Sequence, residues 1–192
     1  MYENEWEKLI SIIKNYDVSN INRLLYAFEL DKLLIAAEDH RFMSHHGVDY
    51  IALCRATWRT LFCGRREGGS TIAMQLVRVL TNKYDITLSR KFSESYLAIR
   101  LTKNIPKDKI ISLYLSVAYF GWNMNGIIEA IQKLNLDQNN LSQYDAASLI
   151  ARLKYPEPKV KSLHRKNLIE IRAKYILSRY EKLFLRRVDG TI

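Results

Sequence analysis

The sequence contains little glycine, proline or cysteine. Its 192 residues include seven glycines, three prolines and two cysteines, and 48% of them are hydrophobic. So few helix-breaking residues argue against a disordered or strand-rich protein and favour a mainly helical one. The chain is long enough to bury a substantial core. Because no change of composition marks a boundary, we expect a single domain over residues 1–192.

The two cysteines, Cys54 and Cys63, are nine positions apart in a segment that we expect to be helical. Nine helical residues span about 13 Å, which is too far for a disulfide bond unless the chain bends. We therefore expect two half-buried thiols. Their spacing is also not typical of a metal site.

A long apolar run is also lacking, since no stretch approaches the roughly 20 apolar residues of a membrane-spanning helix. Residues 1–5 are acidic rather than basic, and no apolar segment follows them, so the sequence predicts no secretory signal peptide. As written, the chain is expected to be soluble or peripheral to a membrane.

Positive charge is plentiful, with 30 Lys and Arg residues against 20 Asp and Glu residues and a net charge of +10. This excess favours an anionic partner, either nucleic acid, a membrane surface or a phosphorylated substrate. The basic residues are scattered over several expected helices, and no nucleic-acid-binding motif occurs. We therefore expect no nucleic-acid partner.

Apolar residues recur at helical spacing along most of the chain, so the predicted fold class is all-α. Ser70 or Thr71 is expected to cap one helix, and residues 142–145 have the form of a capping box. The expected helices cover residues 6–13, 19–28, 32–39, 51–62, 72–80, 88–99, 107–118, 127 onward, 143–153 and about 162–185.

Two of these helices carry an expectation about which face is buried. Residues 51–62 interleave apolar side chains with basic ones, which fits either a membrane-interface helix or a core helix with a solvated basic face. The basic residues in and after this helix are Arg55, Arg59, Arg65 and Arg66. In the helix over residues 88–99, the expected apolar stripe is Leu88, Phe92, Tyr96 and Ile99. Residues 90, 91 and 94 would then face solvent or a cleft.

Two glutamates are candidates for acid–base chemistry. Glu38 closes an apolar run, and Glu94 lies four residues after Arg90. Making or breaking a glycosidic bond needs a group that moves a proton and a group that stabilises developing charge. Each glutamate also has a structural explanation. Glu38 could pair with Arg41 at a helix end, and Glu94 could form an i, i+4 pair worth a few tenths of a kcal/mol.

Two anion-binding features accompany these carboxylates. Arg90 and Lys91 could hold a diphosphate, with arginine as a planar fork and lysine as a point charge. The glycine turn before Ser70 and Thr71 leads into a helix N-terminus, whose backbone N–H groups can bind an anion. Taken singly, each feature is more often an ordinary surface pair or a capped turn.

The order of the motifs is more specific than any one of them. Glu38-Asp39-x-x-Phe42-x-x-His45-x-Gly47 is followed by Gly69-Ser70-Thr71-Ile72-x-x-Gln75-Leu76, Arg90-Lys91-x-x-Glu94, Lys107-x-x-Ile110-Ile111-x-x-Tyr114-Leu115 and Tyr119-Phe120-Gly121. In this order they resemble the family 51 glycosyltransferases, which form the peptidoglycan glycosyltransferase domain of bifunctional penicillin-binding proteins and the monofunctional transglycosylases. The resemblance runs from residue 34 to 158, with a weaker echo at 172–177.

The resemblance implies a lysozyme-like fold with a globular head and a small membrane-facing jaw, in which residues 51–62 meet the bilayer. It implies polymerisation of lipid II into β-1,4 glycan strands, with inversion and release of undecaprenyl diphosphate. It also implies a peripheral location at the outer face of the cytoplasmic membrane. Other cell-wall synthesis proteins are candidate partners.

Individual roles follow from the same resemblance. Glu38 matches the general base, and Glu94 matches a second essential glutamate that helps the diphosphate leave, directly or through a divalent cation such as Mg²⁺ or Mn²⁺. No organic cofactor is expected. The positions that match substrate-binding residues are Arg90, Lys91, Ser70, Thr71, Gln75, Asp39, Phe42, Lys107 and Arg172.

The sequence departs from the family pattern at four positions. Met74 stands where the first of two glutamines is usual, which is expected to remove one amide from the cleft. The other departures are Ser112, Ser116 and Asp145.

Two alternatives remain consistent with the sequence. A lysozyme-like hydrolase or lytic transglycosylase shares the fold and the glutamate, although it has no diphosphate for Arg90 and Lys91 to hold. A catalytically degenerate relative that binds a lipid-linked precursor or a membrane would fit the departures.

Overall fold

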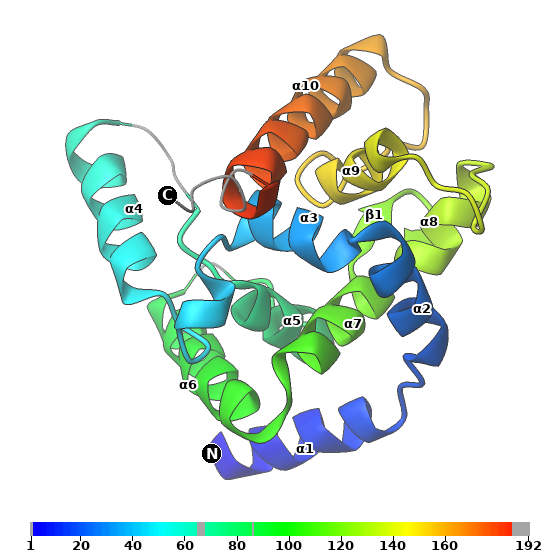
Figure 1. Cartoon of the computed structure of the whole chain (residues 1–192). Coiled ribbons are helices and arrows are strands. Elements are labelled where there is room, and N and C mark those ends of the chain that lie inside the picture. Colours follow the sequence, from blue (N-terminus) through cyan, green and yellow to red (C-terminus); the bar gives the residue numbers. More distant parts are fainter. Residues whose placement is uncertain (1, 65–67, 86, 186–192) are drawn as a thin grey trace, which may run out of the picture. The chain divides into compact units, whose positions relative to one another are not determined.

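The computed structural model describes residues 2–64, 68–85 and 87–185 (Figure 1). Helices α1 to α10 make up most of the described chain, together with one 3₁₀ helix, one π-helical turn and a two-stranded hairpin. The predicted all-α class is therefore confirmed. The chain forms two compact units, which we call unit 1 (Met1–Tyr16 and Arg41–Tyr114) and unit 2 (Asp17–His40 and Leu115–Ile192).

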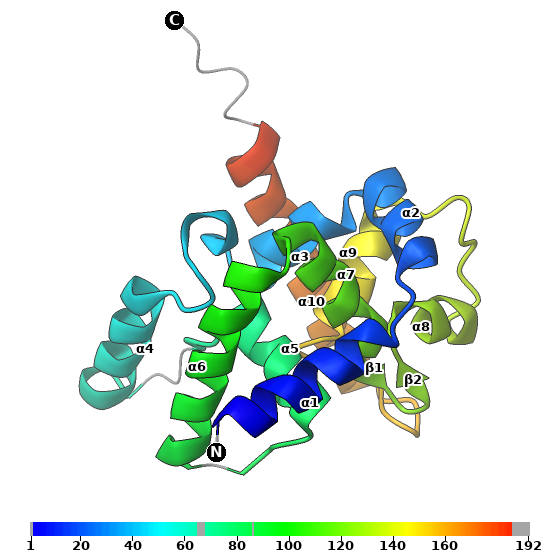
Figure 2. The same cartoon turned by 90° about the horizontal axis from the view of Figure 1, so that it is seen from below.

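Unit 1 is built around a packed pair of helices, α5 and α6, with α1 lying against both (Figure 2). Large apolar side chains such as Leu76, Leu97 and Ile110 are fully buried in its core. Its elements are α1 (Tyr2–Lys14), the 3₁₀ helix η1 (Phe42–Ser44), α4 (Tyr50–Phe62), α5 (Ile72–Thr81), α6 (Leu88–Asn104) and most of α7 (Lys107–Val117).

The start of α5 is fixed by a cap and by a close approach to α6. The Thr71 hydroxyl accepts a hydrogen bond from the backbone N–H of Met74 and donates one to the carbonyl oxygen of Gly47, at 2.6 Å. Gly47 has a φ of +86°, and a Cβ at this position would lie 2.3 Å from the carbonyl oxygen of Ala98 in α6. Only glycine therefore lets this loop lie so close to α6.

The predicted buried face of α6 is wrong. Leu88, Phe92 and Tyr96, three members of the expected apolar stripe, are exposed. The residues that pack inward are Ser93, Glu94, Leu97, Ala98 and Leu101. Tertiary packing has overridden the hydrophobic period, because the face that carries Glu94 finds charged partners inside unit 1.

Helix α4 is also turned outward. Ala56 is its one buried residue, and Trp58 is 61% exposed. The core-helix interpretation of this segment is therefore wrong. The expectation of half-buried thiols is wrong as well, since Cys54 and Cys63 are both free and exposed. Residues 65 and 66, two of the arginines assigned to this segment, lie outside the described residues.

Unit 2 is held by three helices, with α10 packed against α9 and α3, and α3 packed against α9. The predicted capping box is confirmed, because Asp145 and Ser142 bond each other's backbone N–H groups. Asp145 therefore has a structural role at one of the departure positions. The elements are α2 (Ser19–Phe28), α3 (Leu30–Glu38), β1 (Tyr119–Gly121), β2 (Met124–Asn125), α8 (Ile127–Lys133), α9 (Gln143–Ala151), α10 (Leu163–Tyr180) and the π-helical η2 (Glu181–Leu185).

The short hairpin anchors the segment that follows α9. The backbone N–H of Trp122 donates to the carbonyl oxygen of Glu157 at 2.8 Å, and the N–H of Glu157 donates to Phe120 at 2.9 Å. Gly121 has a φ of +150°, and a Cβ there would lie 2.6 Å from the backbone nitrogen of Glu157. This close backbone contact fixes where Glu157 lies.

The junction of α2 and α3 is stabilised by a buried tyrosine. Glu29 adopts a φ of +50° there, and its carboxylate accepts hydrogen bonds from Lys32 and from Tyr180 of α10. Burial, together with the bond to Glu29, raises the pKa of Tyr180 to about 12. The bonds from Lys32 and Tyr180 hold the pKa of the Glu29 carboxyl below its ordinary value.

The raised pKa of Tyr180 predicts a loss of stability at alkaline pH. The folded state keeps the phenol protonated, so its contribution is complete below the pKa of an unfolded tyrosine, about 10. That contribution is then lost as the pH rises toward about 12. Tyr180→Phe should lower the free energy of unfolding by about 1 kcal/mol at neutral pH, and by progressively less above pH ~10.

Urea unfolding of the wild type and variant across this pH range measures the difference. Tyr26→Phe is the control, because Tyr26 is exposed. A difference between wild type and Tyr180→Phe that stays constant with pH would contradict the assignment.

Candidate functional site

Glu94 lies at the centre of a charged cluster in unit 1. Its side chain is only 2% exposed. The carboxylate accepts hydrogen bonds from Arg78 in α5, Nε at 2.8 Å and Nη2 at 3.1 Å, and another from Arg90 in its own helix. Burying a charged carboxylate this deeply is costly unless such partners compensate it. The predicted pair of Arg90 and Glu94 is therefore present, and a second arginine joins it.

The same cluster reaches the loop before α5. Nη2 of Arg78 donates to the hydroxyl of Ser70 at 3.3 Å. Ser70, Arg90 and Glu94, which are separate in sequence, are thus brought together by Arg78. Two guanidinium groups around one carboxylate leave a surplus of one positive charge, and the Arg78 side chain is 28% exposed. This surplus can attract an anion such as a phosphate group.

Arg78 was not among the predicted site residues. One signal in the sequence could have identified it, since it is the sole charged residue of α5. A lone charge in a largely buried helix needs a partner, and that partner is Glu94.

Glu38 forms a second charged pair, in unit 2. It ends α3 and accepts a hydrogen bond from Nη2 of Arg172 in α10 at 3.2 Å. The same Nη2 donates to the carbonyl oxygen of Ala37 at 2.7 Å, and the guanidinium lies over the ring of Tyr175. Both side chains keep some exposure, 18% for Glu38 and 14% for Arg172. The structure thus pairs two predicted site residues that are 134 positions apart.

Lys107 supports the loop around η1 in unit 1. Its ammonium group donates to the carbonyl oxygens of Phe42 and His45, at 2.7 and 2.9 Å, and lies over the Phe42 ring. Phe42 is itself fully buried. Phe42 therefore exposes no surface to a ligand and instead packs inside the loop. The charge of Lys107 is used to bind backbone oxygens of the same loop.

The remaining predicted residues differ in exposure. Thr71 is buried and caps α5, so it supports the site from within. Gln75 is half-buried, and its side-chain oxygen accepts a hydrogen bond from Tyr114 at 2.7 Å. Lys91 is half-buried on α6, and Asp39 is a buried residue at the end of α3.

The match to known proteins covers most of the chain. A family model described as Transglycosylase matches residues 11–181. The chain belongs to the transglycosylase family. This confirms the predicted resemblance, and the enzyme class that goes with the family is a glycosyltransferase.

Curated relatives of this transglycosylase chain include penicillin-binding proteins. It is 36% identical over 138 residues to penicillin-binding protein 1F of Bacillus subtilis, which covers 71% of this chain and 19% of that protein. It is 43% identical over 105 residues to penicillin-binding protein 1A of Escherichia coli, covering 54% of this chain and 12% of that protein. It is 34% identical over 151 residues to penicillin-binding protein 1A of Neisseria lactamica, covering 78% of this chain and 19% of that protein. The matches thus span about a fifth or less of these relatives.

Two departures from the transglycosylase motifs lie in the core of unit 1. Met74 is 1% exposed, so the side chain at this position packs inside the unit and leaves no gap on an exposed surface. The expectation that it removes an amide from a cleft is therefore wrong for this chain. Ser112 is also buried, and its hydroxyl donates to the carbonyl oxygen of Asp108 at 3.0 Å.

Unit 1 of the transglycosylase chain also exposes large apolar side chains on two helices. On α4, Ile51, Trp58, Leu61 and Phe62 recur at helical spacing and form what we call the α4 stripe. The Trp58 and Phe62 rings stack with their centroids 4.2 Å apart. On α6, Leu88, Phe92 and Tyr96 form a second exposed row, which we call the α6 row. Exposed apolar patches of this kind mark interaction surfaces.

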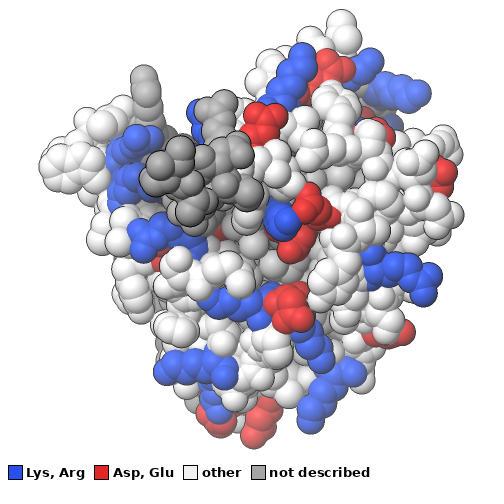
Figure 3. Space-filling view, viewed as in Figure 1, with Lys and Arg blue, Asp and Glu red and all other residues white. Residues whose placement is uncertain are grey.

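Charge and hydropathy add two observations on the described residues. On the face shown in Figure 3, Lys and Arg side chains are dispersed among Asp and Glu side chains and form no single basic patch there. Within residues 2–64, 68–85 and 87–185, no helix is long and apolar enough to cross a membrane.

The Glu94 cluster predicts a large stability effect for Arg78. Arg78→Gln would leave the buried Glu94 carboxylate with Arg90 alone, and removing one partner of a buried ion pair costs roughly 3 kcal/mol. Because Arg78 is partly exposed, we expect about 2 kcal/mol in urea unfolding. Lys103→Gln, at an exposed position of α6, is the control. Equal stabilities of the two variants would show that the cluster does not stabilise unit 1.

Proposed function

We propose that this chain is a peptidoglycan glycosyltransferase that polymerises lipid II into β-1,4 glycan strands. The anomeric carbon of the donor would be inverted, and undecaprenyl diphosphate would leave. The observation that carries the proposal is the Glu94 cluster, in which two arginines and Ser70 surround a buried carboxylate in a transglycosylase-family chain.

Glu38 is the proposed general base. Its carboxylate would accept the proton of the acceptor's 4-hydroxyl as that oxygen attacks the donor's anomeric carbon, and the bond to the diphosphate oxygen would break. Arg172 positions the Glu38 carboxylate by a hydrogen bond at 3.2 Å. Partial exposure leaves the carboxylate accessible to a hydroxyl group.

The Glu94 cluster is the proposed diphosphate site. Arginine binds phosphate oxygens through paired N–H groups, and the surplus charge of the cluster favours a group whose negative charge grows as it leaves. Lys91 adds a further cation on α6. A glycan-cleaving enzyme releases no diphosphate, so this surplus of cations favours transfer over cleavage.

The predicted divalent cation does not fit Glu94 as a resident ligand. Both carboxylate oxygens already accept hydrogen bonds from arginine. Within the described residues, no group of three or more metal-ligating side chains includes Glu94. We therefore propose that any Mg²⁺ or Mn²⁺ arrives with the diphosphate, as part of the substrate.

The central prediction concerns the two glutamates. With labelled lipid II, Mg²⁺ and detergent, the wild type should produce glycan strands that are resolved by gel electrophoresis. Glu38→Gln should lower the rate by about 100-fold or more, because the proton acceptor is lost. Glu94→Gln should lower it as well, and Glu7→Gln, at an exposed position of α1, should not.

Circular dichroism of each variant separates loss of activity from loss of folding. A wild type that forms no polymer, or variants that match it, would contradict the proposed function. Shortening of purified glycan strands by the wild type would instead identify a hydrolase or lytic enzyme.

The exposed apolar side chains of unit 1 support a peripheral membrane location. Aromatic and aliphatic side chains on the α4 stripe are accompanied by Arg55 and Arg59 on the same helix. This combination favours insertion into the headgroup region of an anionic bilayer, where the lipid substrate would also lie. The exposed α6 row extends the apolar surface of the same unit.

Membrane binding should depend on the α4 aromatics. Trp58→Ser combined with Phe62→Ser should lower binding to phosphatidylglycerol vesicles by roughly tenfold in a sedimentation assay, because two side chains no longer enter the interface. Tyr26→Ser removes a similarly exposed aromatic from unit 2 and should have little effect. Equal losses in both cases would argue against a specific membrane surface on α4.

A further inference from the structure

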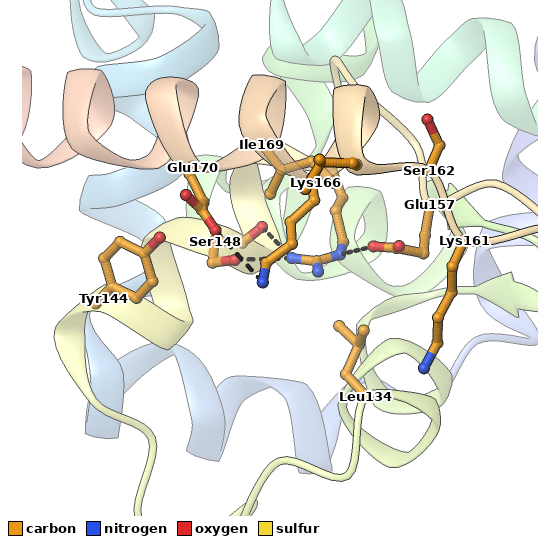
Figure 4. A pocket seen from close by; sticks show the side chains of 11 residues that line it. Leu134, Tyr144, Ser148, Glu157, Lys161, Ser162, Lys166, Ile169 and Glu170 are labelled. Carbon is orange, nitrogen blue, oxygen red and sulfur yellow. Dashed lines mark hydrogen bonds and ion pairs between the residues drawn. The ribbon is translucent and has the colours of Figure 1, made fainter.

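Unit 2 contains a cavity of about 550 Å³ that none of the predicted site residues lines (Figure 4). It lies where α9 meets the first turns of α10, and the segment before α10 and the end of α8 complete its wall. A volume of this size suits a small ligand or a few residues of a peptide.

Arg152 is held in this cavity by three bonds. Nε donates to the Glu157 carboxylate at 2.9 Å, and Nη1 donates to the carbonyl oxygen and the hydroxyl of Ser148, both at 2.8 Å. Its side chain is only 13% exposed. Among the described residues Nη2 has no hydrogen-bond partner. The guanidinium of Arg152, which lines the cavity, is therefore held in place with its Nη2 N–H groups available to a ligand. The hairpin fixes Glu157 in turn, through backbone bonds on both of its sides.

Two lysines add positive charge to the same space. In Figure 4, the ammonium groups of Lys161 and Lys166 lie on either side of Leu134. Lys161 has no ion-pair partner within the described chain, and Lys166 lies 3.9 Å from Glu170, too far for a hydrogen bond. Because Arg152 and Glu157 neutralise each other, these two lysines and Glu170 leave a surplus of one positive charge. The N-terminus of α10 contributes a further partial positive charge.

The other walls are apolar or carry hydroxyl groups. Leu134, Leu163 and Ile169 line the cavity, and Tyr144 lies beside Glu170. A surplus of a single charge matches a carboxylate better than a phosphate monoester, which carries close to two charges. The apolar walls would in addition suit a short aliphatic side chain next to the anion.

We propose that this cavity binds the free carboxylate end of a short peptide. The carboxylate would accept from Nη2 of Arg152 and from the ammonium groups of Lys161 and Lys166, and the last side chain would pack against Leu134 and Ile169. The inference rests on unit 2 alone and requires neither Glu38 nor Glu94. It can therefore fail while the proposed glycosyltransferase activity holds, and the reverse is also true.

The test uses the full chain and three probes, acetyl-Ala-Ala with a free carboxylate, the same peptide as its C-terminal amide, and inorganic phosphate. Binding is measured by calorimetry and by NMR shifts of the residues around the cavity. The free acid is expected to bind and to shift these residues, and the amide and phosphate are expected to bind at least about fivefold more weakly.

Variants locate the binding. Lys161→Gln combined with Lys166→Gln should weaken binding of the acid by roughly fivefold. Arg152→Lys retains the charge but loses the free N–H edge, and it should weaken binding further. Lys174→Gln, at an exposed position of α10 outside the cavity, is the matched control and should change little. Circular dichroism confirms that each variant is folded.

Four outcomes would overturn the proposal. The acid and the amide could bind equally well, so that the carboxylate is not recognised. Phosphate could bind more tightly than the acid, which would make the cavity a phosphate site. The acid could also fail to bind, or could lose as much affinity with Lys174→Gln as with the cavity variants.

Discussion

Unit 1 depends on the neutralisation of one buried carboxylate. Glu94 is turned into the protein, and a charge in that position is tolerated only with close, well-directed partners. Arg78 and Arg90 supply them from two different helices, and the pairing joins α5 to α6 where those helices also pack. Because Arg78 also bonds Ser70, the loop before α5 is set by the same charges. A single ionic cluster thus links a helix pair, a loop and the arginine donors that the proposed function needs.

In both units an arginine from another helix bonds a glutamate. Glu94 lies on the buried face of α6, and Glu38 lies at the end of α3. In unit 2, Arg172 joins α10 to the end of α3 through Glu38 and the neighbouring carbonyl oxygen. Both ion pairs are part of larger hydrogen-bond networks. Arg78 also donates to the Ser70 hydroxyl in the loop before α5, and Arg172 also donates to the Ala37 carbonyl oxygen at the end of α3. The pairs position the carboxylates and at the same time balance their charge. Stability and the proposed chemistry therefore rest on the same contacts, and substitutions of these arginines will affect both.

Local rules predicted much of this structure. The capping box at Ser142, the cap before α5 and the pairing of Arg90 with Glu94 depend on neighbours in sequence, and each is present. The orientation of α6 could not be predicted, because its hydrophobic period points to a face that is exposed. The decisive partner of Glu94 is Arg78, 16 positions away, and a periodicity argument carries no information at that distance. Phe42 shows the same limit, since a motif position gives no indication that its side chain is fully buried.

The arginines around the two glutamates already donate hydrogen bonds to carboxylates, and this affects how a substrate would bind them. The described donors of Arg78, Arg90 and Arg172 that face Glu94 or Glu38 are already engaged by carboxylates. A diphosphate that binds Arg78 and Arg90 must compete with Glu94 for their donors, and it can do so because it carries more charge and more acceptor oxygens than a carboxylate. Any N–H of Arg78 or Arg90 that is donated to phosphate is withdrawn from Glu94, so substrate binding would loosen the contacts that join α5 to α6 through this carboxylate. On the proposed function, substrate binding would therefore act on the Glu94 cluster, while Glu38, the proposed base, keeps its own partner Arg172.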